Sequence, residues 1–335
     1  MRNQEKIFVI GHKNPDTDSI CSAIAYCDIK NRTSQKQRFV PKRAGQINEE
    51  TEYVLSRFGV QPPGYLSNIG TQVKDMDIRM SPDADKSMSL KAAWDIMQEN
   101  SIVSLPIRDK EGALEGLITI GDIAKTYMDT TDSYLLSRAR TQYQKIAETI
   151  HGEIIEGNPH GYFIKGRVMV GTANPDKMKE YIEEDDMIIM GDREEDHLQA
   201  IAQNVSCIIV GLGIQVTEKV VKLAHEKDII IIASPYDTFT IARLINQSIP
   251  VRYIMKTDNL VTFNTEDFTD DIQDVMIKHR HRAFPVINKK GKCIGTISRR
   301  NFLGMHKKQV VLVDHNEVDQ AVDNIEKADT LEIID

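Results

Sequence analysis

Cysteine is scarce in this sequence, with 4 residues among 335, and no two of them form a C-x-x-C pair. This excludes a dense disulfide framework and favours reduced thiols in a cytoplasmic protein. Long apolar runs are also missing, because nothing approaches the roughly 20 residues of a membrane-spanning helix, so we expect neither membrane insertion nor secretion. Basic residues are the minority, 42 Lys and Arg against 50 Asp and Glu, which disfavours nucleic acid as a partner.

The clearest internal feature is a repeat offset by 179 residues, in a chain long enough for several domains. Each copy predicts an amphipathic helix (90–100 and 269–279), then a strand, a glycine turn, a second strand and a second helix. The matched positions are Met97, Pro106, Gly116, Thr119 and Asp122 in the first copy, and Met276, Pro285, Gly295, Ser298 and Asn301 in the second.

Between the copies, residues 130–246 form a different α/β segment, in which short β-branched runs such as 187–190 alternate with helical patterns. The outer stretches, 1–68 and 307–335, each contain apolar strands but are too short to build a core alone. We therefore expect them to pack together, with residues 69–306 inserted between them.

The first chemically distinctive segment follows residues 7–10, a continuous apolar run typical of a strand buried on both faces of a parallel sheet. The next loop carries an imidazole and two carboxylates, from His12, Asp16 and Asp18. Ligands of open α/β sheets bind at the carboxyl ends of strands, and this donor set suits Mn²⁺, Co²⁺, Zn²⁺ or Fe²⁺ rather than Ca²⁺. The alternative is that Asp16 or Asp18 only caps the next helix and His12 is an exposed loop residue.

A second apolar run, 310–313, ends at Asp314, His315 and Glu317, so two strands ending in ligand-type residues predict one shared site. A third run ends the sequence at Asp335. Because globular chains rarely stop at the carboxyl end of a core strand, we expect the sequence to be truncated.

The motifs GHKNPDTDS at 11–19, LVDHNE at 312–317 and the terminal EIID resemble the first three motifs of the family II inorganic pyrophosphatases, in the DHH phosphoesterase superfamily. The insertion resembles that of the CBS-domain-containing, nucleotide-regulated members. The implied fold class is α/β, a split and incomplete parallel-sheet DHH domain with an inserted α/β regulatory region. The implied domains are an N-terminal segment of the DHH domain at 1–68, CBS repeat 1 at 69–129, a DRTGG-type domain at 130–246, CBS repeat 2 at 247–306 and a truncated C-terminal segment of the DHH domain at 307–335.

The resemblance implies a manganese- or cobalt-dependent enzyme that hydrolyses inorganic pyrophosphate to two phosphates, with Mg²⁺ accompanying the substrate. His12 and Asp16 would hold one Mn²⁺ or Co²⁺, Asp18 would hold the second, and Asp314 would bridge them. Such an arrangement suits two-metal hydrolysis.

Two further residues of the second motif, His315 and Glu317, would lie beside the metals as catalytic proton-handling groups or as supports for the ligands, with ordinary surface roles as the alternative. The sequence departs from the family at its third motif, Asp-His-His, because it stops at the first residue, Asp335. The later ligand aspartate and the basic C-terminal domain are also missing. We therefore expect the 335-residue chain to be inactive and its parent protein to be active.

In CBS domains, the pattern Gly-x-x-Thr/Ser-x-x-Asp/Asn places a hydroxyl near a phosphate and an acid or amide on the ribose, and both copies satisfy it. The residues are Thr119, Asp122, Ser298 and Asn301, and Arg280 and Arg282 add positive charge beside the second copy. The implied ligands are AMP, ADP, ATP or a diadenosine polyphosphate, and paired CBS modules imply a symmetric homodimer. The alternative is that the hydroxyls only cap the following helices and the arginines form a solvated face.

Three functions stay open at this point: a nucleotide-regulated pyrophosphatase, an adenine-nucleotide-binding regulatory module, and a DHH-superfamily phosphodiesterase. The inserted repeat argues against the third. The central segment resembles DRTGG signatures at 191–195 and 234–239, but Val210-Gly211-Leu212-Gly213 departs from the usual Thr-Gly-Gly. Its glycines predict a tight strand-to-helix turn more simply than a phosphate loop.

Overall fold

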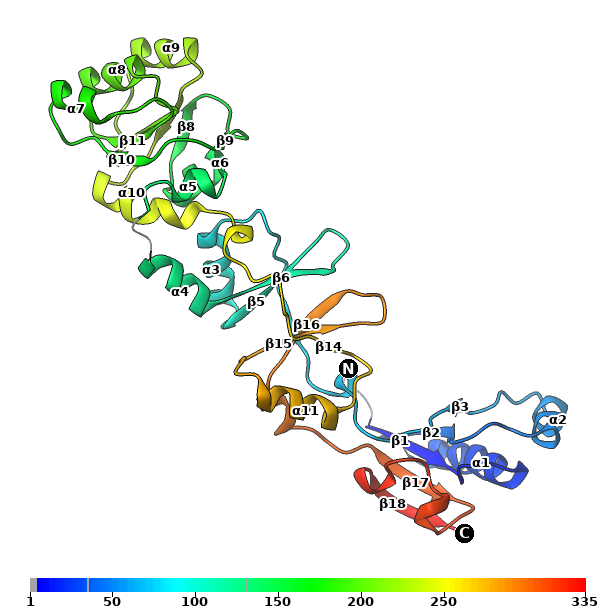
Figure 1. The fold of residues 1–335 in the computed structure, drawn as a ribbon. Coiled ribbons are helices and arrows are strands. Elements are labelled where there is room, and N and C mark those ends of the chain that lie inside the picture. Colours follow the sequence, from blue (N-terminus) through cyan, green and yellow to red (C-terminus); the bar gives the residue numbers. More distant parts are fainter. Residues whose placement is uncertain (1–4, 35, 130–131) are drawn as a thin grey trace. The chain divides into compact units, whose positions relative to one another are not determined.

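The computed structural model describes residues 5–34, 36–129 and 132–335, and these form two compact units (Figure 1). Unit 1 holds residues 1–79, 263–289 and 297–335, and unit 2 holds residues 80–262 and 290–296. The expected domain boundary after residue 129 falls at residues 130–131, outside the described residues. Within the described ranges, no helix combines the length and the apolar character needed to span a bilayer.

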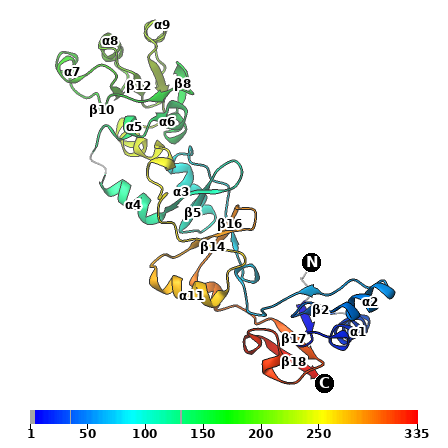
Figure 2. The same ribbon diagram turned by 45° about the vertical axis from the view of Figure 1, so that its right-hand side comes forward.

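Unit 1 is built on a five-stranded sheet with strand order β18-β17-β1-β2-β3, in which every pairing is parallel. β1 pairs with β17 so that Ile10 stands opposite Leu312. Figure 2 shows the blue N-terminal elements next to the red strands β17 and β18. The prediction that the two ends of the chain share one sheet is confirmed. The strands are β1 (Glu5–Ile10), β2 (Gln37–Arg43), β3 (Gly64–Tyr65), β17 (Gln309–Val313) and β18 (Asp329–Ile334).

Both faces of β1 are buried, which explains its continuous apolar sequence. Val9 packs on one face with Ala23 of α1 (Thr17–Thr33), whereas Ile10 packs on the other face with Ile69. Unit 1 also contains α2 (Glu49–Arg57), β14 (Phe263–Asn264), α11 (Thr269–Lys278) and β15 (Phe284–Ile287).

The second copy of the repeat ends in a shorter helix than the sequence predicts. The first copy has α4 (Ile120–Asp129), whereas the second has only the four-residue 3₁₀ helix Arg299–Phe302. Gly304 takes the place that Lys125 has in the first copy, and glycine in a helix costs about 1 kcal/mol relative to alanine. The second helix predicted for each copy is thus an α-helix in the first copy and a short 3₁₀ helix in the second.

The first copy lies in unit 2, where β5 and β6 form an antiparallel hairpin with Pro106 opposite Leu117. Helix α3 begins after Ser89, whose hydroxyl accepts a hydrogen bond from the Ala92 amide. The remaining strands and helices of the repeat region are β4 (Arg79–Met80), α3 (Leu90–Glu99), β5 (Ser104–Arg108), β6 (Leu114–Thr119) and β16 (Cys293–Ile297).

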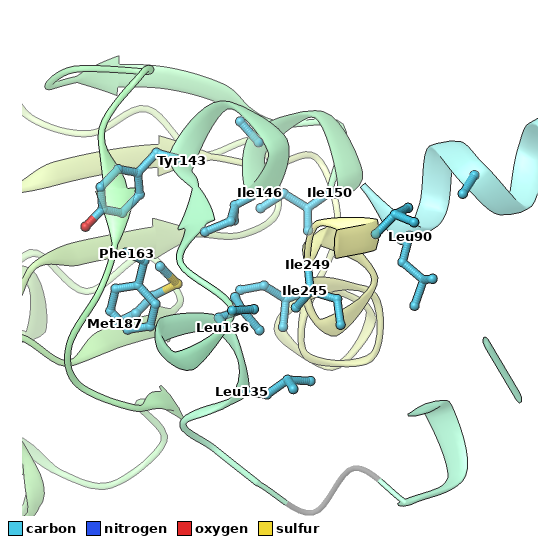
Figure 3. Close-up of a cluster of buried hydrophobic side chains, with 14 of the residues drawn as sticks. Leu90, Leu135, Leu136, Tyr143, Ile146, Ile150, Phe163, Met187, Ile245 and Ile249 are labelled. Atoms are coloured by element: carbon cyan, nitrogen blue, oxygen red, sulfur yellow. The ribbon is translucent and has the colours of Figure 1, made fainter. Parts of the chain in front are cut away.

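The central segment of unit 2 forms its own sheet, in the order β10-β11-β12-β13-β8, with only β8 antiparallel. Alternate residues of its strands face two separate cores, as Ile188 and Ile189 do. One of these cores extends from the central segment to Leu90 of α3 (Figure 3). The sheet strands are β8 (Glu153–Glu156), β10 (Val168–Val170), β11 (Met187–Met190), β12 (Cys207–Val210) and β13 (Ile230–Ala233).

Three helices pack on one face of this sheet and three on the other. The first set is α7 (Pro175–Tyr181), α8 (Glu194–Ala202) and α9 (Glu218–Glu226), and the second set is α5 (Leu135–Arg138), α6 (Tyr143–Thr149) and α10 (Thr238–Leu244). A two-stranded ribbon, β7 (Thr141–Gln142) with β9 (Tyr162–Phe163), adjoins them.

Candidate metal centre and nucleotide-binding repeats

The loops that follow β1 and β17 meet at the carboxyl edge of the unit 1 sheet. There the Nε2 atom of His12 lies 3.3 Å from Oδ2 of Asp314 and 3.8 Å from Oδ1 of Asp16. One possible ligand atom from each of these residues lies within 4.8 Å of the others. The side chains of His12 and Asp314 are only 21% and 26% exposed, whereas that of Asp16 is 60% exposed. The structure thus brings together three of the four predicted metal ligands.

Local structure explains how these three side chains are held. The His12 amide donates to the Ser19 hydroxyl at 3.1 Å, and a Cβ on Gly11 would meet the same hydroxyl oxygen at 1.8 Å, so only glycine fits there. Asp16 is the N-cap of α1, since its Oδ1 accepts from the Ser19 amide at 3.0 Å. The capping alternative for Asp16 is therefore realised, and it coexists with the contact to His12.

Asp314 has the least ordinary backbone in the cluster. Its φ of 58° lies in the left-handed region, and its amide donates to the Ile334 carbonyl of β18 at 2.8 Å. Its pKa is raised, first by burial and then by the negative charges of Asp16 and Asp18. Its Oδ2 atom is buried without a hydrogen-bond partner in the described structure. An orphaned oxygen among like charges, beside an imidazole, fits a divalent cation of the Mn²⁺ or Co²⁺ kind.

Asp18, the fourth predicted ligand, is not in this cluster. It lies in the first turn of α1, is exposed, and its Oδ1 accepts from the Ser22 hydroxyl one turn later at 2.9 Å. Asp18 nevertheless contributes negative charge to the surroundings of Asp314.

The other residues of the second motif differ sharply in burial. His315 is 3% exposed, and its Nδ1 lies 2.9 Å from the Val313 carbonyl, while its Nε2 is buried without a hydrogen-bond partner in the described structure. Glu317 is exposed and precedes a short 3₁₀ helix. Asp335 accepts from the side-chain amide of Asn316 at 2.6 Å.

In the first repeat, Thr119 and Asp122 are hydrogen-bonded to each other. Oδ2 of Asp122 accepts from the Thr119 amide at 2.9 Å and from its hydroxyl at 2.6 Å. The other oxygen of Asp122 forms an ion pair with Lys256, with Nζ 3.2 Å from Oδ1. Lys256 was not predicted from the sequence, because it belongs to neither motif.

The second repeat shows the same pattern with neutral partners. Oδ1 of Asn301 accepts from the Ser298 amide at 2.7 Å and from its hydroxyl at 2.8 Å. The Ser298 side chain also accepts from the Asn301 amide, which completes a capping box at the 3₁₀ helix. Its Nδ2 donates to the Asp77 carbonyl at 2.5 Å. The local capping geometry considered from the sequence is thus present in both repeats.

The basic segment after α11 is exposed at Arg280 and Arg282. The rings of His279 and His281 stack at 5.8 Å with an interplanar angle of 10°. Arg299 donates to the carbonyls of Met276, His279 and His281, so this arginine fixes the backbone of the segment.

Comparison with known proteins agrees with this organisation. Residues 145–248 match the DRTGG domain, and residues 74–129 and 251–307 match the CBS domain. A cobalt-dependent inorganic pyrophosphatase of Clostridium perfringens is 38% identical over 332 residues, covering 99% of this chain and 60% of the relative. A probable manganese-dependent inorganic pyrophosphatase of Thermotoga maritima is 30% identical over 342 residues, covering 100% of this chain and 61% of the relative.

A solved structure extends the comparison to three dimensions. The CBS and DRTGG domains of the regulatory region of Clostridium perfringens pyrophosphatase, complexed with the activator diadenosine tetraphosphate, align with a TM-score of 0.65 at 35% identity. That alignment covers 68% of this chain and 100% of the solved one. The chain spans about three fifths of the length of the curated relatives it matches, 60% and 61%. It belongs to the family of inorganic pyrophosphatases whose regulatory region carries CBS and DRTGG domains.

Proposed function

We propose that this chain belongs to a pyrophosphatase that hydrolyses inorganic pyrophosphate to two phosphates and is regulated by adenine nucleotides. The observation that carries the proposal is the meeting of His12, Asp16 and Asp314 at the carboxyl ends of β1 and β17. Family membership supports it, because the relatives are named for this activity and for their cobalt or manganese dependence.

The three clustered side chains would hold one Mn²⁺ or Co²⁺, and Asp18 would serve a second ion, with Asp314 between them. When bound, such ions act as Lewis acids and lower the pKa of water, with Mg²⁺ accompanying the substrate. The chain's own residues contribute orientation and charge. The Asp16 cap fixes the start of α1, whose N-terminal amides favour an anion such as a phosphate group. His315 and Glu317 would lie beside the ions.

The two repeats would bind the regulatory nucleotides: AMP, ADP, ATP or a diadenosine polyphosphate. The activator bound to the Clostridium perfringens regulatory region supports this assignment. Asp122 and Asn301 would contact ribose hydroxyls, while Thr119, Ser298 and the exposed arginines at 280 and 282 would contact phosphates. We also propose a homodimer through the CBS pair and a cytoplasmic location.

Metal binding by the chain itself gives the first test. Co²⁺ and Mn²⁺ are titrated by calorimetry into the unaltered chain and into Asp314→Asn. The variant should bind each ion at least tenfold more weakly than the unaltered chain, of the order expected for a lost charged contact. Asp28→Asn is a matched control, since Asp28 is an exposed acid of α1 paired with Arg32 at 2.8 Å. Equal affinity in Asp314→Asn and the control would refute the metal site.

Activity needs a second test, in which phosphate release from pyrophosphate is followed for the chain and for a version completed with the remaining segment of the Clostridium perfringens relative. We expect hydrolysis by the completed version with Co²⁺ or Mn²⁺, and its loss in Asp314→Asn. A completed version that binds adenine nucleotides but never hydrolyses pyrophosphate would favour the second candidate, a regulatory nucleotide-binding module. This second candidate is supported by the hydrogen bonds between the motif residues of each repeat, Thr119 with Asp122 and Ser298 with Asn301.

A further inference from the structure

Lys256 forms, with Asp122 and Thr119, a compact polar cluster at the end of β6. Its Nζ lies 3.2 Å from one carboxylate oxygen of Asp122, and the other oxygen accepts from the Thr119 hydroxyl at 2.6 Å. An ammonium, a carboxylate and a hydroxyl therefore lie together, which we call the Lys256 cluster. The Asp122 side chain is 16% exposed, whereas that of Lys256 is 58% exposed, so its ammonium has room to change partners.

The backbone of Lys256 is held firmly against β6. The amide of Lys256 donates to the Leu117 carbonyl and the Leu117 amide donates to the Lys256 carbonyl, each at 2.9 Å, and Figure 1 shows the chain after α10 passing beside β6. A Cβ on Gly116 would lie 3.0 Å from the Lys256 carbonyl oxygen and 2.7 Å from Met255 Sδ. The glycine of the repeat motif thus allows this segment to lie close to Thr119 and Asp122.

We propose that Lys256 binds the phosphate of an adenine nucleotide at the first repeat, an inference that rests on the proposed nucleotide binding. Asp122 can accept hydrogen bonds from both hydroxyls of a ribose, but its charge repels a phosphate attached to the same sugar. An ammonium beside the carboxylate offsets that repulsion, and lysine binds phosphate as a compact point charge. Without nucleotide, the Lys256 ammonium pairs with Asp122; with nucleotide bound, it contacts the phosphate.

The second repeat shows why this role is confined to one site. The position 179 residues before Lys256 is Asp77, and its carbonyl contacts Asn301, as the Lys256 side chain contacts Asp122. Both repeats thus have a contact between the matching segment and the last residue of the motif, but the side chain at this position is acidic in the second repeat. In the second repeat the positive charge comes instead from Arg280 and Arg282. Loss of Lys256 should therefore weaken one nucleotide site and spare the other.

The test is calorimetric titration of the 335-residue chain with ADP and with adenosine, which lacks a phosphate. In Lys256→Gln we expect one ADP site to weaken about tenfold or more, as for a lost hydrogen bond between charged groups, while adenosine binding changes less than about twofold. Lys256→Arg keeps the charge and should retain most of the ADP affinity. Lys91→Gln is the control, because Lys91 pairs with Asp95 at 2.5 Å on α3 of the same unit.

Each outcome separates the two proposals. Unchanged ADP binding in Lys256→Gln, or an equal loss for ADP and adenosine, overturns the role of Lys256 and leaves nucleotide binding intact. If the unaltered chain binds neither ADP nor adenosine, the nucleotide-binding proposal fails and this inference fails with it. Thermal melting of Lys256→Gln beside Lys91→Gln checks that both are folded, and Lys256→Arg gives a second comparison of ADP with adenosine.

Discussion

A substitution of His315 gives the sharpest test of how the proposed metal centre is held together. Because the Val313 carbonyl can only accept, the Nδ1 atom of His315, 2.9 Å away, must donate. This hydrogen bond spans Asp314, whose φ of 58° is left-handed. We therefore expect the imidazole to lock the backbone conformation that directs the Asp314 carboxylate toward His12. Asparagine can imitate the Nδ1 donor of histidine, whereas glutamine places its amide nearer the position of Nε2.

The expected size of the effect follows from two terms. A hydrogen bond of this kind contributes a net of about 0.5–1.5 kcal/mol, and a non-glycine residue in the left-handed region costs of the order of 1–3 kcal/mol. If His315→Gln removes this hydrogen bond, the Asp314 backbone can relax. The free energy of the metal-binding conformation then rises by about 1–2 kcal/mol relative to the relaxed one. The dissociation constant for Co²⁺ should then rise about 5- to 30-fold. His315→Asn should change it by less than about threefold.

The assay is Co²⁺ and Mn²⁺ titration of both variants beside the unaltered chain. Both should lose some stability, because the side chain is 3% exposed and each replacement disturbs its packing, so only the metal affinity distinguishes them. His306→Gln is the control, since His306 is exposed in the same unit. Equal metal affinities in His315→Asn and His315→Gln would show that the Nδ1 hydrogen bond does not hold Asp314.

Three further predictions address packing and charge elsewhere in the chain. Gly116→Ala should lower the free energy of unfolding by about 1–3 kcal/mol in urea, because its Cβ would lie 2.7 Å from Met255 Sδ; an unchanged midpoint would contradict the close approach. Glu156 raises the pKa of His225 above its ordinary 6.5, so this pair stabilises the fold fully below that pH and loses its effect as pH rises through the raised value. In Glu156→Gln an NMR titration should show the His225 pKa falling toward 6.5, and no fall would refute the pairing. Ile189→Ala, at a fully buried strand position, should cost about 2–5 kcal/mol by calorimetric melting, and a loss under about 1 kcal/mol would contradict its burial.

The sequence predicted those features that depend on local pattern. The apolar runs at 7–10 and 310–313 could be recognised as buried parallel strands, and parallel strands end at one edge, so the approach of His12 to Asp314 followed. The repeat offset likewise matched Thr119 with Ser298 and Asp122 with Asn301, and the structure shows the same hydrogen-bond pattern within each pair of motif residues.

The features that the sequence did not predict depend on side-chain direction or on contacts between distant segments. Asp18 stands two residues after Asp16, but as a helical residue it bonds Ser22 one turn later and stays outside the cluster. Lys256 reaches Asp122 only because its backbone pairs with β6, a contact between segments more than a hundred residues apart. The local periodicity of the sequence cannot predict a contact between segments so far apart.

The placement of the proposed ligands would link metal binding to the stability of unit 1. His12 and Asp16 follow β1, and Asp314 follows β17, so an ion held by all three joins the two ends of the chain. A ligand that binds only the folded state stabilises it by about 2.7 kcal/mol at a hundredfold excess over its dissociation constant. The raised pKa of Asp314 indicates the cost of its negative charge without a cation, because burial first, and then the charges of Asp16 and Asp18, favour the protonated carboxyl. If the proposed site holds a cation, we expect the carboxyl edge of the sheet to be more stable with the cation bound than without it.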